Sequence, residues 1–523
     1  KVYTIEYPLN SQRHKPGARA ALLRAWSEGA ILVNYVGHGN LVQFAHERVF
    51  VVQEDLPKLT NGTKQPILTA LTCSAGHFDD AQTEAVAEDV LWSEDGGAIA
   101  SVAATRLSFN NPNIRFNEQF LKNLFRTKRV MRIGEAFFKA KTWAYYSTPS
   151  IRDNAMKYVL LGDPAMTVAM PEMQVNISVT PDTITALAPV SVSGAVTDDV
   201  GDTLLDFNGK AIVRLFDTSR HVIYKSAANV PVHYTVDGGT IFRGLFAVTS
   251  GLFEAEAVVP ADITFGADDA RVVAFVFADQ ADGSGSLEGL PIDRLAADVG
   301  ADKAGPTISF HRADGRGAIG TRLFSGDPIY PPDPLRVALS DPSGINTTGE
   351  IGRAITLTID DPASGPINLT DRFFYQNSAF EGWADVPLDG MSPGVHRMSV
   401  QAWDARNNVA ADSLTIDIGQ AGAPALADLV AYPNPMSAQS AFTYTLLGVP
   451  QGSDAEVTIT IYSVAGRLVE RLPVQLQRSG PQVVEWSPLR RPANGVYLYR
   501  ITARDSDTGQ SVSKTERLAV IAK

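Results

Sequence analysis

Two short segments contain residue types that together could cleave a peptide bond. Gly37-His38-Gly39 follows the apolar run Ile31–Val36, and Cys73 follows a second apolar run, Ile67–Thr72. An imidazole within hydrogen-bond reach of a thiol lowers the pKa of that thiol and supplies a general base and acid. Cys73 is the only cysteine in 523 residues, so the chain forms no internal disulfide. We therefore predict that His38 and Cys73 are a catalytic pair.

The backbone around these two residues could supply the rest of an acyl-transfer site. Glycines on both sides of His38 allow a sharp turn that exposes the ring just past a strand end, where open α/β sheets bind ligands. The amides of Gly39 and Cys73 are the candidates for an oxyanion hole. Two simpler interpretations stay open, because a lone cysteine at a strand end is commonly a small buried apolar residue and a Gly-His-Gly segment is often only a turn.

Further polar residues flank the two motifs. His46, His77, Asp79 and Asp80 could together approach a metal ion, but their spacing is irregular and we predict no metal site. We also predict no cofactor.

Two charged residues have a functional and a structural interpretation. Glu47 could orient an imidazole or be a solvated surface carboxylate. Arg106, beyond the apolar stretch Gly96–Ala104, could bind a carboxylate or form a structural salt bridge.

The elements that must position these residues form a mixed α/β pattern up to about residue 170. Apolar runs alternate with stretches of helical periodicity, which predicts βαβ units on a largely parallel sheet. The apolar runs are Val2–Tyr7, Ala18–Ser27, Ile31–Val36, Ile67–Thr72 and Ala98–Ala103, and the helical stretches include Ala81–Ser93 and Ile133–Trp143. Because the chain enters an expected strand at once, we expect earlier strands of this sheet to lie outside the sequence.

After about residue 171 the pattern changes to short alternating strands broken by Gly, Pro, Asp and Asn, which is typical of β-sandwiches. Examples are Val175–Val179, Val190–Val196, Ala211–Phe216 and Ala354–Ile359. Linkers are expected near Met170–Met173, Asp302–Pro306 and Gly419–Ala427. We therefore predict four domains: an α/β domain at 1–170, and β-sandwich domains at 171–302, 303–420 and 424–523.

Composition excludes several classes of protein. With 45% hydrophobic and 20% charged residues, the chain can bury cores and is not disordered. No apolar run approaches the roughly 18 to 20 residues that span a bilayer as a helix. Residues 1–170 carry 19 Lys and Arg and 16 Asp and Glu, so the net charge of −12 arises in the later part. Without a clustered basic face, we predict no nucleic-acid partner.

Several motifs of the first 170 residues resemble the gingipain family of cysteine peptidases in order and spacing. They are Val33–Gly39, Leu68–Cys73, Phe78-Asp79, Gly96–Ala100, Thr105-Arg106, Arg132–Ala136 and Leu160–Ala165. The resemblance implies a partial, N-terminally truncated caspase-like α/β domain with His38 and Cys73 as its dyad. Any acid that the family supplies from the earlier part to orient the histidine would lie outside this sequence.

The later motifs narrow the resemblance within the family. Asp206–Gly209, Gly251–Phe253, Val259–Ile263, Ser343–Asn346 and Trp403-Asp404 resemble the sortase, or C-terminal signal peptidase, of the type IX secretion system. Tyr432–Pro435, Val457–Arg467 and Gly495–Arg500 resemble the C-terminal sorting-type, Ig-like β-sandwich of the same route. A turn at Ala465-Gly466 between Thr458–Val464 and Leu468–Leu472 is expected from the residues alone.

This resemblance implies a cell-surface, outer-membrane-associated enzyme that removes the C-terminal signal domain of exported cargo. The cargo would pass from a Cys73 acyl-enzyme to an amine of lipopolysaccharide, with outer-membrane secretion components as further partners. Two alternatives remain open: a secreted gingipain-like protease that merely carries a sorting domain, and a non-catalytic surface scaffold.

Overall fold

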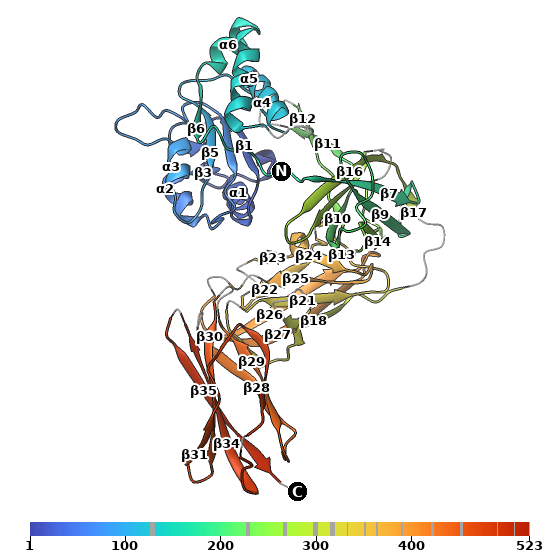
Figure 1. Ribbon diagram of the computed structural model, residues 1–523. Helices are drawn as coiled ribbons and strands as arrows, with labels where there is room; N and C mark the ends of the chain where they lie inside the picture. Colours follow the sequence, from blue (N-terminus) through green and yellow to red (C-terminus); the bar gives the residue numbers. More distant parts are fainter. Residues whose placement is uncertain are drawn as a thin grey trace. The chain divides into compact units, whose positions relative to one another are not determined.

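The structure, a computed structural model, describes residues 1–523 except 126–130, 226–230, 265–268, 296–301, 314–318, 332, 350–351, 362–364, 387, 389–390, 420–422, 450–452, 489, 507 and 522–523. The chain divides into two compact units, Lys1–Met170 and Pro171–Lys523 (Figure 1). In the described parts of both units, no helix is long and apolar enough to cross a membrane.

The first unit is built on a four-stranded sheet in the order β1-β4-β5-β6. Strands β1, β4 and β5 are parallel, and β6 runs antiparallel to β5. Every residue of β4 and β5 is buried, as expected for parallel strands covered on both faces. The strands are β1 (Leu32–Val36), β2 (Gln43–Phe44), β3 (Phe50–Val51), β4 (Ile67–Leu71), β5 (Ala100–Ala104) and β6 (Tyr158–Gly162).

Helices cover the two faces of this sheet and form two separate cores (Figure 1). On one face, Trp26 of α1 and Val90 of α3 pack with Leu68 of β4. On the other face, Phe116 of α4 and Ala140 of α5 belong to a second core. The helices are α1 (Pro16–Glu28), α2 (Val52–Asp55), α3 (Val86–Trp92), α4 (Asn110–Leu124), α5 (Ile133–Tyr145) and α6 (Pro149–Ala155), with 3₁₀ turns η1 (Thr4–Glu6) and η2 (Leu56–Lys58).

Most of the secondary structure predicted for this unit is confirmed, with two corrections. The predicted strand Val2–Tyr7 is wrong: the segment holds η1, because the Tyr7 N–H bonds to the Thr4 carbonyl within the turn rather than to a neighbouring strand. The helix expected at Ala81–Ser93 begins only at Val86, because the Asp80 carboxylate accepts the N–H groups of residues 82 and 83 in a turn. The run Ala18–Ser27 lies within α1.

The second unit is all β, which confirms the predicted fold class of an α/β region followed by β-sheet domains. Twelve strands form one sheet in the order β14-β9-β7-β16-β15-β10-β13-β24-β25-β21-β18-β19. Its members are β7 (Met173–Thr180), β9 (Pro189–Thr197), β10 (Gly209–Phe216), β13 (Thr240–Val248), β14 (Leu252–Val258), β15 (Ala270–Phe277), β16 (Asp282–Leu290), β18 (Thr307–Arg312), β19 (Thr321–Arg322), β21 (Leu335–Ser340), β24 (Phe373–Gln376) and β25 (Glu381–Val386).

Smaller sheets complete the region before residue 420. They are β11 (Arg220–Lys225) with β12 (Pro231–Val236), β8 (Ile184–Ala186) with β17 (Ile292–Leu295), and a five-stranded sheet of β20 (Pro328–Ile329), β27 (Val409–Ile418), β26 (Gly394–Trp403), β22 (Thr356–Ile359) and β23 (Ile367–Asn368). A 3₁₀ turn, η4 (Thr370–Arg372), precedes β24.

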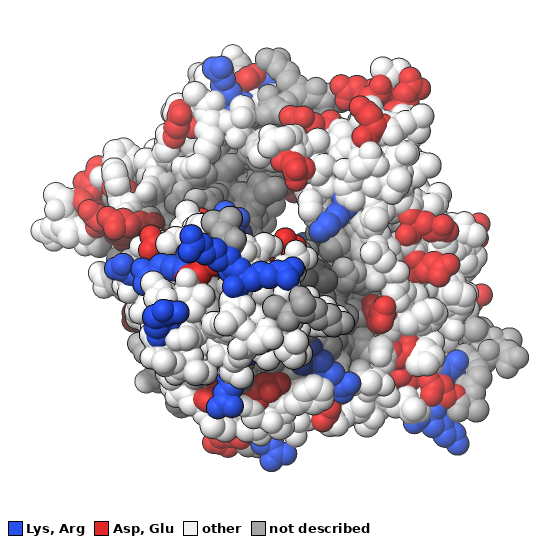
Figure 2. Space-filling model, turned by 60° about the horizontal axis from the view of Figure 1, so that its bottom comes forward, with Lys and Arg blue, Asp and Glu red and all other residues white. Residues whose placement is uncertain are grey.

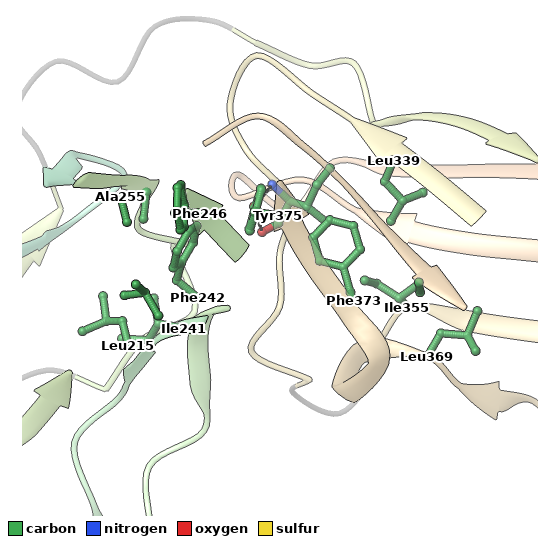
Figure 3. Packing of buried hydrophobic residues seen from close by; sticks show 14 of the residues in the cluster. Leu215, Ile241, Phe242, Phe246, Ala255, Leu339, Ile355, Leu369, Phe373 and Tyr375 are labelled. Atoms are coloured by element: carbon green, nitrogen blue, oxygen red, sulfur yellow. Dashed lines mark hydrogen bonds between the residues drawn. The ribbon is translucent and has the colours of Figure 1, made fainter. Parts of the chain in front are cut away.

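The large sheet runs across the boundary predicted at residues 302 and 303. Gly244 of β13 pairs in parallel with Tyr375 of β24. Aromatic rings reinforce this junction, because Phe242 stacks on Tyr375 at 4.8 Å and Phe373 meets Tyr375 edge-on at 5.1 Å (Figure 3). A single buried cluster contains residues from both sides. The division at 302/303 stays a prediction.

Residues from 425 onward form two facing sheets with their own core. The sheets are β28-β29-β33 and β31-β30-β34-β35, with β32 paired to β30. Tyr499 packs against Phe442, whose ring lies 5.9 Å from that of Trp486. The strands are β28 (Ala425–Tyr432), β29 (Ser440–Leu447), β30 (Ala455–Ser463), β31 (Leu468–Arg471), β32 (Gln475–Gln477), β33 (Gly480–Trp486), β34 (Gly495–Asp505) and β35 (Ser511–Val520).

Two sequence predictions concern this last region. The turn at Ala465-Gly466 is confirmed, since β30 and β31 pair antiparallel around it and Gly466 has a φ of +78°. The linker predicted at Gly419–Ala427 is shorter than expected, because β28 already begins at Ala425; residues 420–422 lie outside the described residues.

Charged side chains are unevenly distributed on the face drawn in Figure 2. Acidic groups lie scattered in separate spots, and some of the Lys and Arg side chains lie together in a short row near the middle of the view while others are scattered.

A buried carboxyl in the second unit gives a prediction about stability. Asp333 is 7% exposed, and its Oδ2 accepts the Gly448 N–H at 3.0 Å. Burial raises the pKa of Asp333 to about 6. Because this folded-state pKa exceeds the unfolded value, ionisation costs stability as pH rises through about 4 to 6. We expect Asp333→Asn to raise the melting temperature at pH 7, by an amount equivalent to about 1–2 kcal/mol, and not at pH 4.

Thermal unfolding of both proteins at the two pH values checks this prediction. Asp182→Asn, at an exposed position, is the control and should change neither melting temperature. An equal gain for Asp333→Asn at pH 4 and pH 7 would contradict the electrostatic cause.

Candidate active site

The pairing of β1 with β4 brings the two predicted catalytic residues to one end of the sheet. The strands are parallel and in register, with Val36 opposite Leu71. The pairing continues past the strands, because the Gly37 N–H donates to the Leu71 carbonyl at 3.4 Å. His38 and Cys73 therefore each lie two residues beyond partners in adjacent strands, whose backbones are about 4.8 Å apart.

Residues of both strands show which face of the sheet α4 and α5 cover. Leu32 of β1 and Leu71 of β4 pack on the core beneath α4 and α5, and Asn117 of α4 donates to Asn34 Oδ1 at 3.0 Å. Because side chains alternate along a strand, Asn34 and Val36 of β1 belong to the same series as Leu32, and Thr69 of β4 belongs to the same series as Leu71.

Gly39 contacts the end of β4 directly. A Cβ atom at Gly39 would lie 2.6 Å from Thr72 Oγ1 and 2.9 Å from the Gln43 carbonyl oxygen. Both distances are shorter than van der Waals contact allows, and Thr72 is fully enclosed. The absence of a side chain at position 39 therefore lets the His38 loop approach the Cys73 loop.

The backbone of His38 is fixed while its ring stays exposed. The His38 carbonyl accepts the Tyr35 hydroxyl at 2.6 Å and the Ala45 N–H at 2.7 Å. Burial raises the pKa of Tyr35, so this hydroxyl keeps its proton and remains a donor. The exposed His38 imidazole stacks on His46, with ring centroids 6.0 Å apart. The imidazole is therefore accessible from solvent.

The thiol of Cys73 is partly buried and contacts Ser108 in the loop after β5. The Ser108 N–H donates to Sγ at 3.4 Å, and the thiol donates to the Ser108 carbonyl at 3.4 Å. Within the described residues, no hydrogen bond joins Sγ to the His38 ring. The structure thus brings the two residues to neighbouring strand ends without a direct bond between them, as is common in sites without substrate.

Two backbone amides at these strand ends are uncommitted. The turn at Gly39 is closed by the bonds from Ala45 N–H to the His38 carbonyl and from Asn40 N–H to the Gln43 carbonyl. Among the described residues, neither the Gly39 N–H nor the Cys73 N–H donates a hydrogen bond. Both are therefore available to a ligand.

Arg106 forms a structural salt bridge, the second of the two interpretations that the sequence left open. Its guanidinium binds both carboxylate oxygens of Asp79, at 2.9 and 2.6 Å. These bonds lower the pKa of Asp79 to about 2, with a smaller contribution from His77, whose Nε2 lies 3.4 Å from the same carboxylate. The pair ties the Cys73 loop to the end of β5, since the Ser74 N–H also bonds to the Arg106 carbonyl.

Sequence reasoning missed two features. Ser108 contacts the Cys73 thiol although it lies 35 positions away in the chain, and no motif marks it. In the second unit, Asp302, Asp341 and Asp404 bring one carboxylate oxygen each within 4.8 Å of the others. Protein groups already bind this cluster: the Ser343 hydroxyl donates to Asp302 at 2.6 Å, and burial raises the pKa of Asp341 to about 6.

The close approach at Gly39 predicts a stability defect. In Gly39→Ala the new methyl group overlaps Thr72 Oγ1 and the Gln43 backbone, so the two loops must separate. We expect the first unit to lose about 1–3 kcal/mol, seen as a lower melting temperature. Gly17→Ala is the matched control, because its Cβ meets only the movable Tyr7 ring and alanine favours the helix there. Equal melting temperatures for Gly39→Ala and the parent chain would show that position 39 tolerates a side chain.

Comparison with known protein families finds a match at each end of the chain. Residues 1–169 match peptidase family C25, and residues 430–514 match the secretion system C-terminal sorting domain. No curated protein matches the chain.

Solved structures show more distant similarity. Dimeric latent PorU from Porphyromonas gingivalis is 24% identical, with a TM-score of 0.33, over 82% of this chain and 42% of that chain. The complex of the pro- and mature domains of RgpB from the same organism is 18% identical, with a TM-score of 0.28, over 51% of this chain and 57% of that chain. The present chain thus spans less than half of the PorU chain.

The family matches confirm the predicted resemblance. The sorting domain implies secretion through the type IX route to the cell surface or outer membrane. Residues 1–169 therefore match peptidase family C25, the gingipain family of cysteine peptidases that the sequence motifs resemble, and residues 430–514 of the same chain match a secretion system C-terminal sorting domain.

Proposed function

We propose that this chain is part of a cell-surface sortase of the type IX secretion system, with Cys73 as nucleophile and His38 as general acid and base. The observation that supports it most is the parallel register of β1 and β4, which places the only cysteine and the Gly-His-Gly histidine two residues beyond paired positions. This arrangement lies within the segment that matches a family of cysteine peptidases.

The proposed reaction begins when His38 accepts the thiol proton of Cys73. The sulfur attacks the peptide carbonyl carbon at the junction between cargo and its C-terminal signal domain. The resulting oxyanion accepts hydrogen bonds from the Gly39 and Cys73 amides, which have no other acceptor among the described residues. The C–N bond then breaks, and His38 donates its proton to the leaving amine, which leaves a thioester.

The thioester is resolved by a second nucleophile. An amine of lipopolysaccharide attacks the acyl carbon, His38 takes the amine proton, and the Cys73 sulfur leaves. Attack by water would yield a free carboxylate instead. The partly buried sulfur and the exposed imidazole are compatible with either acceptor. Transfer to the amine would make the enzyme a sortase, and transfer to water would make it a protease.

Replacing the nucleophile tests the enzymatic function. With Cys73→Ala in the full-length protein, exported cargo should reach the surface untrimmed and without lipid, because no acyl-enzyme can form. Mass spectrometry of surface cargo measures this, and restoring the original gene should restore trimming. Normal trimming and lipid attachment in the variant would instead favour the non-catalytic scaffold.

An added amine distinguishes transfer from hydrolysis. We incubate the full-length enzyme with a cargo fragment that ends in a sorting domain, with and without a small primary amine. Sortase activity should give a trimmed cargo whose mass includes the amine, at the expense of the free acid. Only free acid at every amine concentration, together with cleavage of unrelated proteins, would identify a gingipain-like protease.

A further inference from the structure

One face of the sorting-domain sandwich carries a group of exposed arginines. Strands β31, β30, β34 and β35 form its larger sheet, and alternate residues of these strands, such as Ile461 and Ile501, are buried in the core. The residues between them therefore form an outer series that faces away from the core. That series includes Arg471 of β31, Arg500 of β34 and Arg517 of β35, all of them exposed.

Strand pairing brings the three arginines close together. Arg471 and Arg500 pair with Thr460 from opposite sides of β30, so their Cα atoms lie about 9–10 Å apart. Thr515 is the partner of Arg500 in β35, and Arg517 is the next residue of the outer series, at a diagonal distance of about 7–8 Å from Arg500. Like charges at these spacings repel one another unless an anion lies between them. We call Arg471, Arg500 and Arg517 the arginine face.

The chain itself does not neutralise the arginine face. Within the described residues, none of its three members forms an ion pair, whereas Arg478 of the same domain binds Asp454 at 3.2 Å. In the described part of these strands, Glu456 is the only carboxylate of the outer series. It lies opposite Arg504, four residues along β30 from Thr460. The arginine face thus has three positive charges available to an anion from outside the chain.

Arg500 is held by its neighbours in a way that leaves one end of its guanidinium free. Its Nε donates to Thr515 Oγ1 at 3.3 Å, and its Cζ lies 5.6 Å from the centre of the Tyr462 ring. Among the described residues, its two terminal nitrogens have no hydrogen-bond partner. A planar guanidinium with both terminal nitrogens free can bind two oxygens of a phosphate, sulfate or carboxylate group at once.

We propose that the arginine face binds a polyanionic glycan, a sugar chain that carries phosphate, sulfate or carboxylate groups. Hydroxyl groups of the same outer series lie beside the arginines and match the hydroxyls of a sugar; they belong to Thr458, Thr502, Ser513 and Thr515. The backbone groups of the inner strands are used in strand pairing, so the face offers a ligand only side-chain groups. A peptide lying on it would leave its own backbone without partners, whereas a sugar chain has no such requirement. This inference goes beyond the proposed function and does not depend on Cys73.

Binding of fluorescein-labelled dextran sulfate to the intact chain, measured by fluorescence anisotropy at several salt concentrations, tests this proposal. Arg500→Gln removes the guanidinium but keeps an exposed polar side chain. We expect it to weaken binding about three- to tenfold and to reduce the slope of log K against log salt concentration by about one. Arg500→Lys keeps the charge without the planar guanidinium and should bind with intermediate affinity. The double variant Arg471→Gln/Arg517→Gln should weaken binding at least as much as Arg500→Gln.

Arg478→Gln is the matched control, because it removes the same charge from an exposed arginine that already has a carboxylate partner. Its affinity and salt slope should equal those of the parent chain. Neutral dextran should not bind, and polyglutamate of matched charge should bind more weakly than dextran sulfate. Circular dichroism verifies that each variant is folded.

Three results would overturn the proposal. Equal losses in Arg478→Gln and Arg500→Gln would show that net charge alone attracts the polymer. Unchanged binding in both Arg500→Gln and the double variant would place the polymer elsewhere, and either variant decides this if the other does not fold. Polyglutamate that binds as tightly as dextran sulfate would identify the face as a site for an acidic protein. The assay needs no peptidase activity, so its outcome is separate from that of the sortase proposal.

Discussion

The parallel pairing of β1 and β4 is the constraint on which the candidate site depends. Parallel strands cannot be joined by a tight turn, so the chain between His38 and Cys73, which are 35 positions apart, must leave the sheet and return. They do so through η2 and the short pair β2 and β3. The register then decides whether the two side chains meet, because a shift by one residue would move one of them to the opposite face.

The contact between Gly39 and Thr72 maintains this register at the point where the strands end. Hydrogen bonds of the sheet stop near Gly37, and beyond it the two loops are held by close packing and by the bonds that Tyr35 and Ala45 make to the His38 carbonyl. The imidazole itself stays in solvent. A fixed backbone that carries an exposed ring is compatible with the role proposed for His38, which would first accept and then donate a proton.

The sulfur, in contrast, is held from the side of the third strand. Ser108 follows β5, and α4 and α6 contribute the asparagines that fix it. Buried polar groups are tolerated here because nearly all of them are paired. The Cys73 thiol is thus supported by elements that share no sequence motif with it.

The sequence by itself determined which residues are candidates for chemistry, the apolar runs that precede them, the change from α/β to β at about residue 170, and the family resemblance. These features are local: a run of buried residues, a glycine pair and a set of spaced motifs can be read without knowing what they contact. Tertiary structure alone decided the pairing of Arg106 with Asp79, the turn at Thr4–Glu6 in place of a strand, the continuous sheet from β13 to β24, and the position of Ser108 beside Cys73. Each of these depends on which distant segments of the chain become neighbours. The free energies of strand pairing, ion pairing and burial depend on the contacts that a residue makes, not on its type alone.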